Sequence, residues 1–432
     1  MKTKVLMFGW EFPPRISGGL GTASYGLTKG LAKHGVEILF VMPKACGEED
    51  QSAVKIINAS EVEMMDSYAT REEYWRFVQF IEVGSNLVPY LDPEVFEQEA
   101  SAAIRDHAGE SRVTFRNKFQ FSGKYGVNLM EEVARYALVA GTIASQNSFD
   151  VIHAHDWLTY EAGIVAKRVS GKPLVVHVHA TEFDRSGEGK INQQVYDIER
   201  RGMHAADRVI AVSNLTRNIV IKHYGVAPEK VVTVHNAVDF QSYKEVTVER
   251  GVPEKVVTFL GRITYQKGPE YFIEAANKVL KHYPNVRFVM AGSGDMLNRA
   301  IRRVAQLKIA THFHFTGFLS GDDVQRMFAQ SDVYVMPSVS EPFGISPLEA
   351  MRSGVPTIIS KQSGVSEVLE NSIKVDFWDV DAMSDAIYGL LAYPALARVT
   401  GKAGLEEVNR LKWENAAEKI KCLYYELIHA EN

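Results

Sequence analysis

Short apolar runs rich in β-branched residues alternate with segments of helical periodicity along most of the chain. This alternation is typical of parallel sheets flanked by helices, so the pattern predicts an α/β fold. The expected strands of the first half lie at residues 5–8, 36–42, 150–155, 172–177, 208–212 and 231–234. Those of the second half lie at residues 256–260, 287–291, 312–315, 333–336 and 356–359, with helices such as 269–281 between them. The pattern therefore predicts two doubly wound sheets in series.

The two series of elements are separated by a polar, turn-rich segment at residues 235–255, which we interpret as an inter-domain linker. We therefore assign residues 1–240 to an N-terminal domain and residues 254–412 to a C-terminal domain. Residues 58–125 are rich in aromatic and charged side chains and interrupt the alternation, so we interpret them as an insertion in the first domain. Doubly wound sheets bind ligands outside the carboxyl ends of their strands, and two such domains in tandem predict a deep cleft between them.

Composition and charge narrow the classes of partner. The 432 residues carry a formal net charge of −5 and no long basic run, which argues against nucleic acid as a partner. No apolar run approaches the roughly 20 residues of a membrane span, and the N-terminus lacks a secretory signal pattern. The two cysteines, Cys46 and Cys422, form no disulfide or zinc motif, so we expect a cytoplasmic protein. These features do not predict an oligomeric state.

The segment EPFGISPLEA, residues 341–350, carries two glutamates between an expected strand and an expected helix. Ser346 as N-cap, Pro347 at the first helical position and Glu349 at the third predict a capping box. Glu341 has no such local role. Its carboxylate can accept hydrogen bonds from hydroxyl groups, whereas the helix N-terminus beside it attracts an anion such as a phosphate. A nucleotide sugar combines both kinds of group, so we expect one to bind here.

Further residues of the second half suit the diphosphate of such a ligand. Arg262 and Lys267, in LGRITYQKGPE, follow an expected strand and precede a helix, so they supply cations at the same edge of the sheet. Gly294, in AGSGD, follows the next strand and lets the backbone approach a ligand closely. Taken alone, the two cations are more typical of a solvated loop, and AGSGD could be an ordinary turn with an N-cap aspartate.

In the first half, RISGGLGT at residues 15–22 precedes an expected helix at 22–34. The glycines stand too far from the preceding strand for a dinucleotide fingerprint, and no P-loop lysine follows them. We keep the general interpretation that the backbone at Gly18 and Gly19 faces the diphosphate from the opposite side of the cleft.

Two histidine pairs stand at the ends of neighbouring expected strands. His153 and His155 alternate in VIHAHDW, as do His177 and His179 in VVHVHATEFDR, so each pair shares one face of its strand. Such pairs, together with Asp156 or Asp184, could coordinate zinc and activate water. They could equally hydrogen-bond the hydroxyls of a sugar, an interpretation that also gives the carboxylates and cations of the second half a role.

These motifs together resemble the retaining GT-B glycosyltransferases of family 4, and in particular the bacterial and archaeal glycogen and starch synthases. The resemblance covers most of the chain outside the insertion at 58–125. The segments that carry it are GGL, HAHDW, HVHATEFD, VSNLTRNIV, VHNAVD, GRITYQKG, AGSGD, GFLS and EPFGISPLEAMRSGVP. The last, with its spaced glutamates, is the most specific of them.

The resemblance implies two Rossmann-like domains that face across a deep cleft, with a last helix within 413–432 returning to the first domain. Arg262 and Lys267 would bind the diphosphate, and Glu349 the ribose. Glu341, with His155 or His179, would contact the transferred sugar. The other substrate-binding positions implied by the matching segments are Arg15, Gly18, Gly19, Asp156, Gly294, Phe343, Gly344, Ile345 and, beside the base, Phe318 and Leu319. No metal or other cofactor is expected, since cations can stabilise the leaving diphosphate.

The implied reaction transfers glucose, with retained anomeric configuration, from ADP- or UDP-glucose to the non-reducing end of an α-1,4-glucan. One position departs from the pattern, because Ile16 occupies the site of a lysine usual in glycogen synthases and Arg15 stands beside it. The alternatives are transfer to another saccharide or to a lipid-linked acceptor, a zinc-dependent hydrolase, and a non-catalytic glucan-binding protein.

Overall fold

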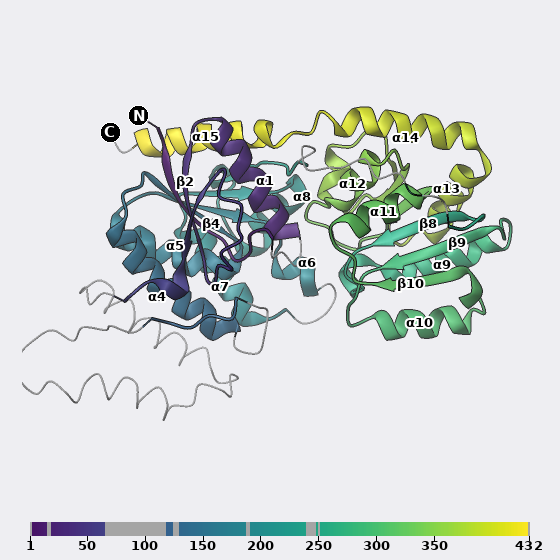
Figure 1. Ribbon diagram of the computed structural model, residues 1–432, viewed down its shortest axis with the longest axis horizontal. Helices are drawn as coiled ribbons and strands as arrows, with labels where there is room; N and C mark the ends of the chain where they lie inside the picture. The colour runs from purple at the N-terminus through teal and green to yellow at the C-terminus, as the bar shows by residue number, and fades with distance from the viewer. Residues whose placement is uncertain are drawn as a thin grey trace, which may run out of the picture.

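The computed structural model describes residues 2–14, 19–64, 118–123, 129–186, 191–238, 248 and 251–430. Within these residues the chain forms two β-sheets, each flanked by helices, which lie side by side along the long axis of the molecule (Figure 1). Most of the predicted insertion at 58–125, together with Arg15 and Gly18, lies outside the described residues.

The first sheet has the strand order β3-β2-β1-β4-β5-β6-β7 in the described residues, and all its neighbouring strands are parallel. Its strands are β1 (Lys4–Phe8), β2 (Glu37–Met42), β3 (Lys55–Asn58), β4 (Val151–His155), β5 (Leu174–Val178), β6 (Arg208–Ala211) and β7 (Val231–Thr233). The order runs from β1 to one edge and then returns to the other side of β1, which creates a switch point between β1 and β4.

The second sheet repeats this winding, with the order β10-β9-β8-β11-β12-β13. Its strands are β8 (Lys255–Leu260), β9 (Val286–Ala291), β10 (Phe313–Gly317), β11 (Val333–Met336), β12 (Thr357–Ser360) and β13 (Ile373–Val375). Its switch point lies between β8 and β11. The predicted α/β fold with two doubly wound sheets is confirmed.

Helices cover both faces of each sheet (Figure 1). Those of the first half are α1 (Gly19–Lys33), α4 (Leu129–Gln146), α5 (Trp157–Ser170), α6 (Glu182–Ser186), α7 (Gln193–Ala205) and α8 (Asn214–Tyr224). Those of the second half are α9 (Pro269–Leu280), α10 (Leu297–Gln306), α11 (Asp322–Gln330), α12 (Ser346–Arg352), α13 (Val380–Ala392), α14 (Pro394–Val408) and α15 (Trp413–His429). None of the described helices is long and apolar enough to cross a membrane.

Every strand expected from the sequence is present, with ends that differ by at most a few residues. The pattern missed β3 and β13, which are short strands at the sheet edges and are only partly buried, so their sequences lack a long apolar run. The helix expected at 22–34 begins earlier, at Gly19, so Gly19 and Gly21 lie inside α1 and do not precede it.

Helix α15 follows the second half in sequence but packs against α1 and the first sheet (Figure 1). Glycines on α1 permit this close crossing: a Cβ at Gly26 would meet Trp413 Nε1 at 2.1 Å, and one at Gly30 would meet the Trp413 carbonyl oxygen at 2.8 Å. Trp413 is itself buried, and Lys33 forms an ion pair with Glu414 beside it. The crossing ties the end of the chain to its beginning.

A substitution on α1 tests how closely the two helices must approach. Gly30→Ala places its methyl group against backbone, so we expect overpacking to lower the free energy of unfolding by about 1–3 kcal/mol. This loss is larger than the gain in helix propensity from glycine to alanine. The expected result is a melting temperature lower by a few degrees. Gly389→Ala on α13 is the control, since a Cβ there meets nothing within 4 Å and its melting temperature should hold or rise. Equal shifts for both variants would contradict this packing.

Candidate active site

The loops after β8 and β9 touch backbone to backbone beside the switch point of the second sheet. A Cβ at Gly292, where φ is 141°, would meet the Gly261 carbonyl oxygen at 1.9 Å. One at Gly294 would meet the Ile263 carbonyl oxygen at 2.3 Å, and the Ile263 N–H donates to the Ser293 carbonyl over 2.8 Å. Gly294 was predicted to let the backbone approach a ligand. Its close approach here is to another loop, and that approach fixes the loop carrying Arg262.

The loop after β8 also packs onto the loop after β11, from the other side of the switch point. Gly268, with φ of 64°, follows the 3-10 turn that carries Lys267, and a Cβ there would meet the Pro337 carbonyl oxygen at 2.1 Å. The Val339 N–H donates to the Gln266 carbonyl over 2.8 Å. This packing brings Lys267 and Glu341 together as an ion pair.

Glu341 is 7% exposed, and its carboxylate also accepts a hydrogen bond from Ser338 Oγ at 3.3 Å. A buried carboxylate requires such partners, because an unpaired charge is costly away from water. Arg262, from the same loop as Lys267, is exposed and donates to Gln266 Oε1 at 3.1 Å. These residues lie at one edge of the second sheet, as the sequence predicted. Lys267 is paired with Glu341, whereas Arg262 is exposed to solvent.

The chain turns sharply between Glu341 and α12. Gly344 has φ of 99°, and a Cβ there would lie 3.1 Å from Glu341 Cγ, so this position requires glycine. Phe343 is buried at 3% exposure, and Ile345 is half-buried. A Cβ at Gly19 would lie 3.9 Å from Ile345 Cδ1, which brings the first turn of α1 up to this loop.

The predicted capping box is wrong. Ile345 is the N-cap of α12 and makes no side-chain capping bond, while the hydroxyl of Ser346 pairs with the Tyr334 hydroxyl at 2.7 Å. The Ser346 hydroxyl is thus held by the second sheet and does not cap α12. Burial raises the pKa of Glu349 to about 7.

Phe318 and Leu319 follow β10, on the far side of β9 from the switch point. Phe318 is 64% exposed, while Leu319 packs partly against the core around α12. An aromatic ring so exposed at a strand end is suited to lie against a flat ring system.

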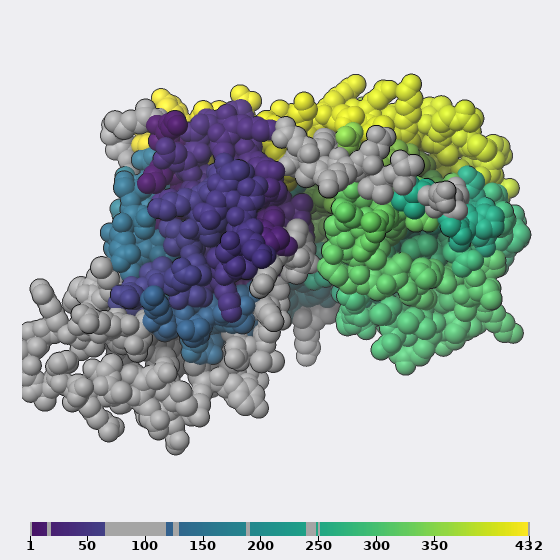
Figure 2. Space-filling model, in the orientation of Figure 1, coloured from purple at the N-terminus to yellow at the C-terminus, as the bar shows by residue number. Residues whose placement is uncertain are grey.

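The two halves meet through the loops at their strand ends, and Figure 2 shows the purple N-terminal elements and the green second half as neighbouring parts of one molecule. Ser340 Oγ donates to Asp184 Oδ1 at 2.6 Å. Glu367 accepts from the N–H groups of Asn214 and Leu215 at the start of α8, both at 2.8 Å, and lies 2.8 Å from His235 Nε2. Sequence reasoning missed these contacts, since a pairing between residues more than 100 positions apart has no local signal.

The four histidines form an array on the sheet face that α15 covers. His155 and His177 are direct partners across β4 and β5, and His153 and His179 flank them. The rings stack, with centroids 4.4 Å apart for His153 and His155 and 4.3 Å for His177 and His179. Burial lowers the pKa of all four imidazoles, for His153 and His179 to about 3, so they are neutral at pH 7.

The histidines predicted to contact a sugar differ in access. His155 is fully buried, whereas His179 is half-buried. The two side chains are neighbours, with His155 Nδ1 and His179 Nε2 2.9 Å apart. Asp156, the N-cap of α5 with φ of 59°, accepts hydrogen bonds from the N–H groups of His179 and Ala180 at 2.7 and 3.3 Å. Its carboxylate thus holds the His179 loop in place.

Comparisons with known proteins identify the family. The model described as Glycosyltransferase Family 4 matches residues 101–242, and that described as Glycosyl transferases group 1 matches residues 244–407. The α-maltose-1-phosphate synthase of Mycolicibacterium smegmatis is 30% identical over 63% of this chain and 78% of its own length. The chain belongs to glycosyltransferase family 4.

This glycosyltransferase is also 27% identical to an uncharacterized glycosyltransferase of Methanocaldococcus jannaschii, over 98% of this chain and 97% of that protein. A glycogen synthase of Mycobacterium tuberculosis is 23% identical over 98% of this chain and 94% of its own length.

Solved structures show the same fold. A sucrose-phosphate synthase from Thermosynechococcus elongatus superposes with a TM-score of 0.72 at 18% identity, over 99% of this glycosyltransferase and 100% of that chain. The Anabaena protein HepE, solved in complex with UDP and glucose, superposes with a TM-score of 0.65 at 17% identity, over 98% and 100% of the two chains. The predicted GT-B architecture is confirmed, and the family membership sets aside the hydrolase and binding-protein alternatives.

The raised pKa of Glu349 gives the glycosyltransferase a testable pH dependence. The pKa of Glu349 is about 7 in the folded state, against an ordinary value of 4.5. Between pH 4.5 and about pH 7 the folded state therefore binds more protons than the unfolded state, so this residue favours folding at low pH. That stability is lost as the pH rises through about 7. Glu349→Gln removes the titration, so its melting temperature relative to wild type should rise by a few degrees between pH 5 and pH 8, equivalent to about 1–2 kcal/mol.

The matched control for this experiment is Glu406→Gln, at an exposed position of α14. Its melting temperature should follow that of wild type across the same pH range. A constant difference between Glu349→Gln and wild type from pH 5 to pH 8 would show that Glu349 does not titrate in this window.

Proposed function

We propose that this glycosyltransferase moves glucose from ADP- or UDP-glucose to the non-reducing end of an α-1,4-glucan, with retained anomeric configuration. The observation that carries the proposal is the meeting of Arg262, Lys267 and Glu341 at the switch point of the second sheet. Ligands of doubly wound folds bind at this point, and this set offers cations for a diphosphate next to a carboxylate for hydroxyl groups.

In the proposed donor complex, the diphosphate lies against Arg262 and Lys267. Helix α12 has seven residues, so we assign the charge compensation to these cations and not to its dipole. Glu349 accepts from the ribose hydroxyls, and the base lies beside Phe318. The first turn of α1, at Gly19, closes the site from the opposite side, as its proximity to Ile345 suggests.

The transferred glucose then lies between Glu341 and the first domain. Glu341 hydrogen-bonds the sugar hydroxyls, and among the histidines His179 takes the corresponding role, because it is the partly exposed one and His155 lies buried behind it. Asp156 acts as a positioning residue through its bonds to the His179 loop. Closing of the two halves brings the acceptor to this sugar.

In the proposed step, the acceptor hydroxyl oxygen forms a bond to the anomeric carbon as the bond from that carbon to the diphosphate oxygen breaks. The electron pair of the breaking bond stays with the nucleoside diphosphate, which takes up the hydroxyl proton. Attack on the same face as the departing phosphate retains the configuration. Arg262 and Lys267 stabilise the charge that develops on the leaving group, so no metal ion is required at the diphosphate.

A second acceptor class stays open for a specific reason. The Mycolicibacterium smegmatis relative is named for forming α-maltose 1-phosphate, and Ile16 occupies the lysine position usual in glycogen synthases. The same donor chemistry therefore also suits a small phosphorylated sugar or another saccharide acceptor. We place the reaction in the cytoplasm, which agrees with the free thiols of Cys46 and Cys422.

The donor and acceptor are tested by measuring nucleotide release from ADP-, UDP- and GDP-sugars with and without glycogen or maltooligosaccharides, in the presence of EDTA. The proposal predicts release from ADP- or UDP-glucose that rises with glucan. Release from another donor that ignores glucan would favour the second acceptor class, and loss of release on adding EDTA would contradict a metal-free transfer.

Removal of the cation that is paired with Glu341 tests the site itself. Lys267→Ala should lower kcat/KM for the donor by at least about 100-fold, because it deletes a charge that stabilises the leaving diphosphate. Arg326→Ala on α11 is the control, since it removes an exposed arginine outside these loops and should retain wild-type turnover. Wild-type turnover in Lys267→Ala, with Arg326→Ala equally active, would exclude this assignment.

A further inference from the structure

A short turn of the second half is packed between the loop that carries Glu341 and the first half. This turn, η5 (Gly364–Glu367), follows β12 and contacts α8. A Cβ at Gly364 would meet the Pro342 carbonyl oxygen at 2.1 Å on one side and Ser213 Cβ at 2.4 Å on the other. The turn is therefore in close contact with both neighbours.

Backbone hydrogen bonds join the turn to the loop on both sides of Glu341. The Glu341 N–H donates to the Gln362 carbonyl at 3.0 Å, and the Glu341 carbonyl accepts from the Gly364 N–H at 2.9 Å. Two residues further along, the Phe343 carbonyl accepts from the Val365 N–H at 2.7 Å. Because these bonds connect the two segments, a displacement of the turn moves Glu341 with it.

The side chain of Glu367, at the end of the turn, bonds the first half. Its carboxylate accepts from the N–H groups of Asn214 and Leu215 at 2.8 Å each. The first turn of α8 has no acidic residue of its own, and the side chain of its N-cap, Ser213, bonds a different N–H group. Glu367 thus supplies, from the other half of the molecule, the negative charge that a helix N-terminus favours.

His235 contacts both Glu367 and the Glu341 loop. Its Nε2 lies 2.8 Å from the Glu367 carboxylate, and its ring centroid is 6.2 Å from that of Phe343. Burial alone would raise the pKa of Glu367, but the hydrogen bonds from His235 and from the two N–H groups of α8 outweigh this effect and hold the pKa below its ordinary value. The carboxylate is therefore charged at neutral pH, the state in which it accepts all these bonds.

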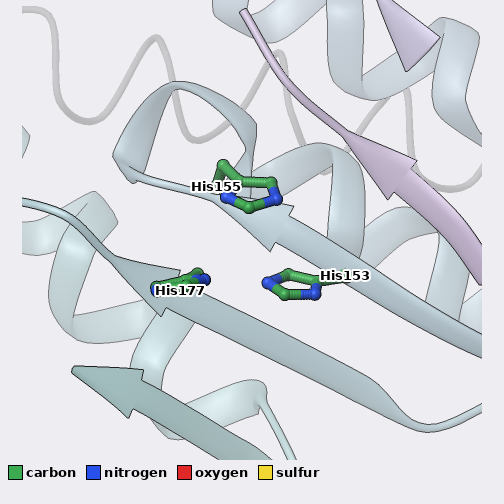
Figure 3. Close-up of side chains that lie close together, drawn as sticks. All are labelled: His153, His155 and His177. Atoms are coloured by element: carbon green, nitrogen blue, oxygen red, sulfur yellow. The ribbon is translucent and has the colours of Figure 1, made fainter. Parts of the chain in front are cut away.

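We propose that Glu367 is a positioning residue, which fixes the loop carrying Glu341 to the first half and so sets the distance between Glu341 and His179. This inference rests on the proposed function, in which these two side chains contact the transferred glucose from opposite halves. His179 is held within the first half, because its ring stacks on His177 and lies beside His155, two of the three rings drawn in Figure 3. The contact of Glu367 with α8 then decides how Glu341 lies relative to His179, and a misplacement of about 1 Å at a reacting centre can lower a rate about 100-fold.

Amide hydrogen exchange of the full-length protein without substrate tests whether this contact is coupled to the loop. Glu367→Ala should speed exchange by at least about 10-fold at Asn214 and Leu215, which lose their acceptor, and also within residues 341–345. Glu370→Ala, which removes an exposed glutamate three positions further on, is the matched control and should exchange like wild type. Faster exchange confined to the start of α8 would show that Glu367 is a helix cap alone, and would overturn the proposal.

Kinetics separate positioning from donor binding. With the nucleotide sugar that wild type uses best, Glu367→Ala should lower kcat about 10- to 100-fold. Its affinity for free ADP or UDP should equal that of wild type, because Arg262 and Lys267 lie on the loop after β8. Glu367→Gln preserves the shape of the side chain and one oxygen acceptor, so it should fold and restore part of the rate, whereas Glu370→Ala should retain all of it.

Two kinetic outcomes would overturn the inference: equal kcat in Glu367→Ala and wild type, or a nucleotide affinity that falls as far as kcat does. Wild-type protein that releases nucleotide from no sugar of the panel would instead contradict the proposed function. The exchange experiment needs no substrate, so it decides the coupling of Glu367 to the Glu341 loop in either case.

Discussion

The close packing of three loops at the carboxyl edge of the second sheet is the constraint on which the candidate site depends. Glycines at 268, 292 and 294 let the backbones approach to distances that a Cβ would block. As a result, the loops on both sides of the switch point are fixed relative to each other, and Lys267 reaches Glu341 without a flexible connection. Groups held in this way need little reorganisation to meet a charged ligand, which is the property that electrostatic catalysis requires.

The two halves of the chain use the same winding but contribute different chemistry. The second sheet offers cations and carboxylates, whereas the first offers neutral imidazoles backed by buried acids. Polar contacts between Ser340 and Asp184 and between Glu367 and the start of α8 hold the halves together. Helix α15 follows the second half in sequence and packs onto the first half. A movement of the two halves relative to each other therefore has to overcome the packing of α15.

Much of this organisation could be predicted from the sequence because it follows from periodicity. Buried parallel strands have apolar runs, and their order along the chain places Arg262, Lys267 and Glu341 at strand ends. The capping box failed for the opposite reason: Ser346 bonds Tyr334, and only the fold brings that hydroxyl near. The bond from Tyr424 to His153 crosses 271 positions and had no sequence signal, although the histidine pairs themselves were evident.

We propose that the second half binds the nucleotide diphosphate at its switch point. Amide hydrogen exchange of the wild-type protein with and without ADP or UDP tests this most directly, because it reports on each loop without any substitution. We expect slower exchange in residues 261–268, 292–295 and 341–349 on nucleotide binding, with less change in the outer helices α10 and α13. Protection confined to the first half, or absent from these three loops at saturating nucleotide, would contradict it.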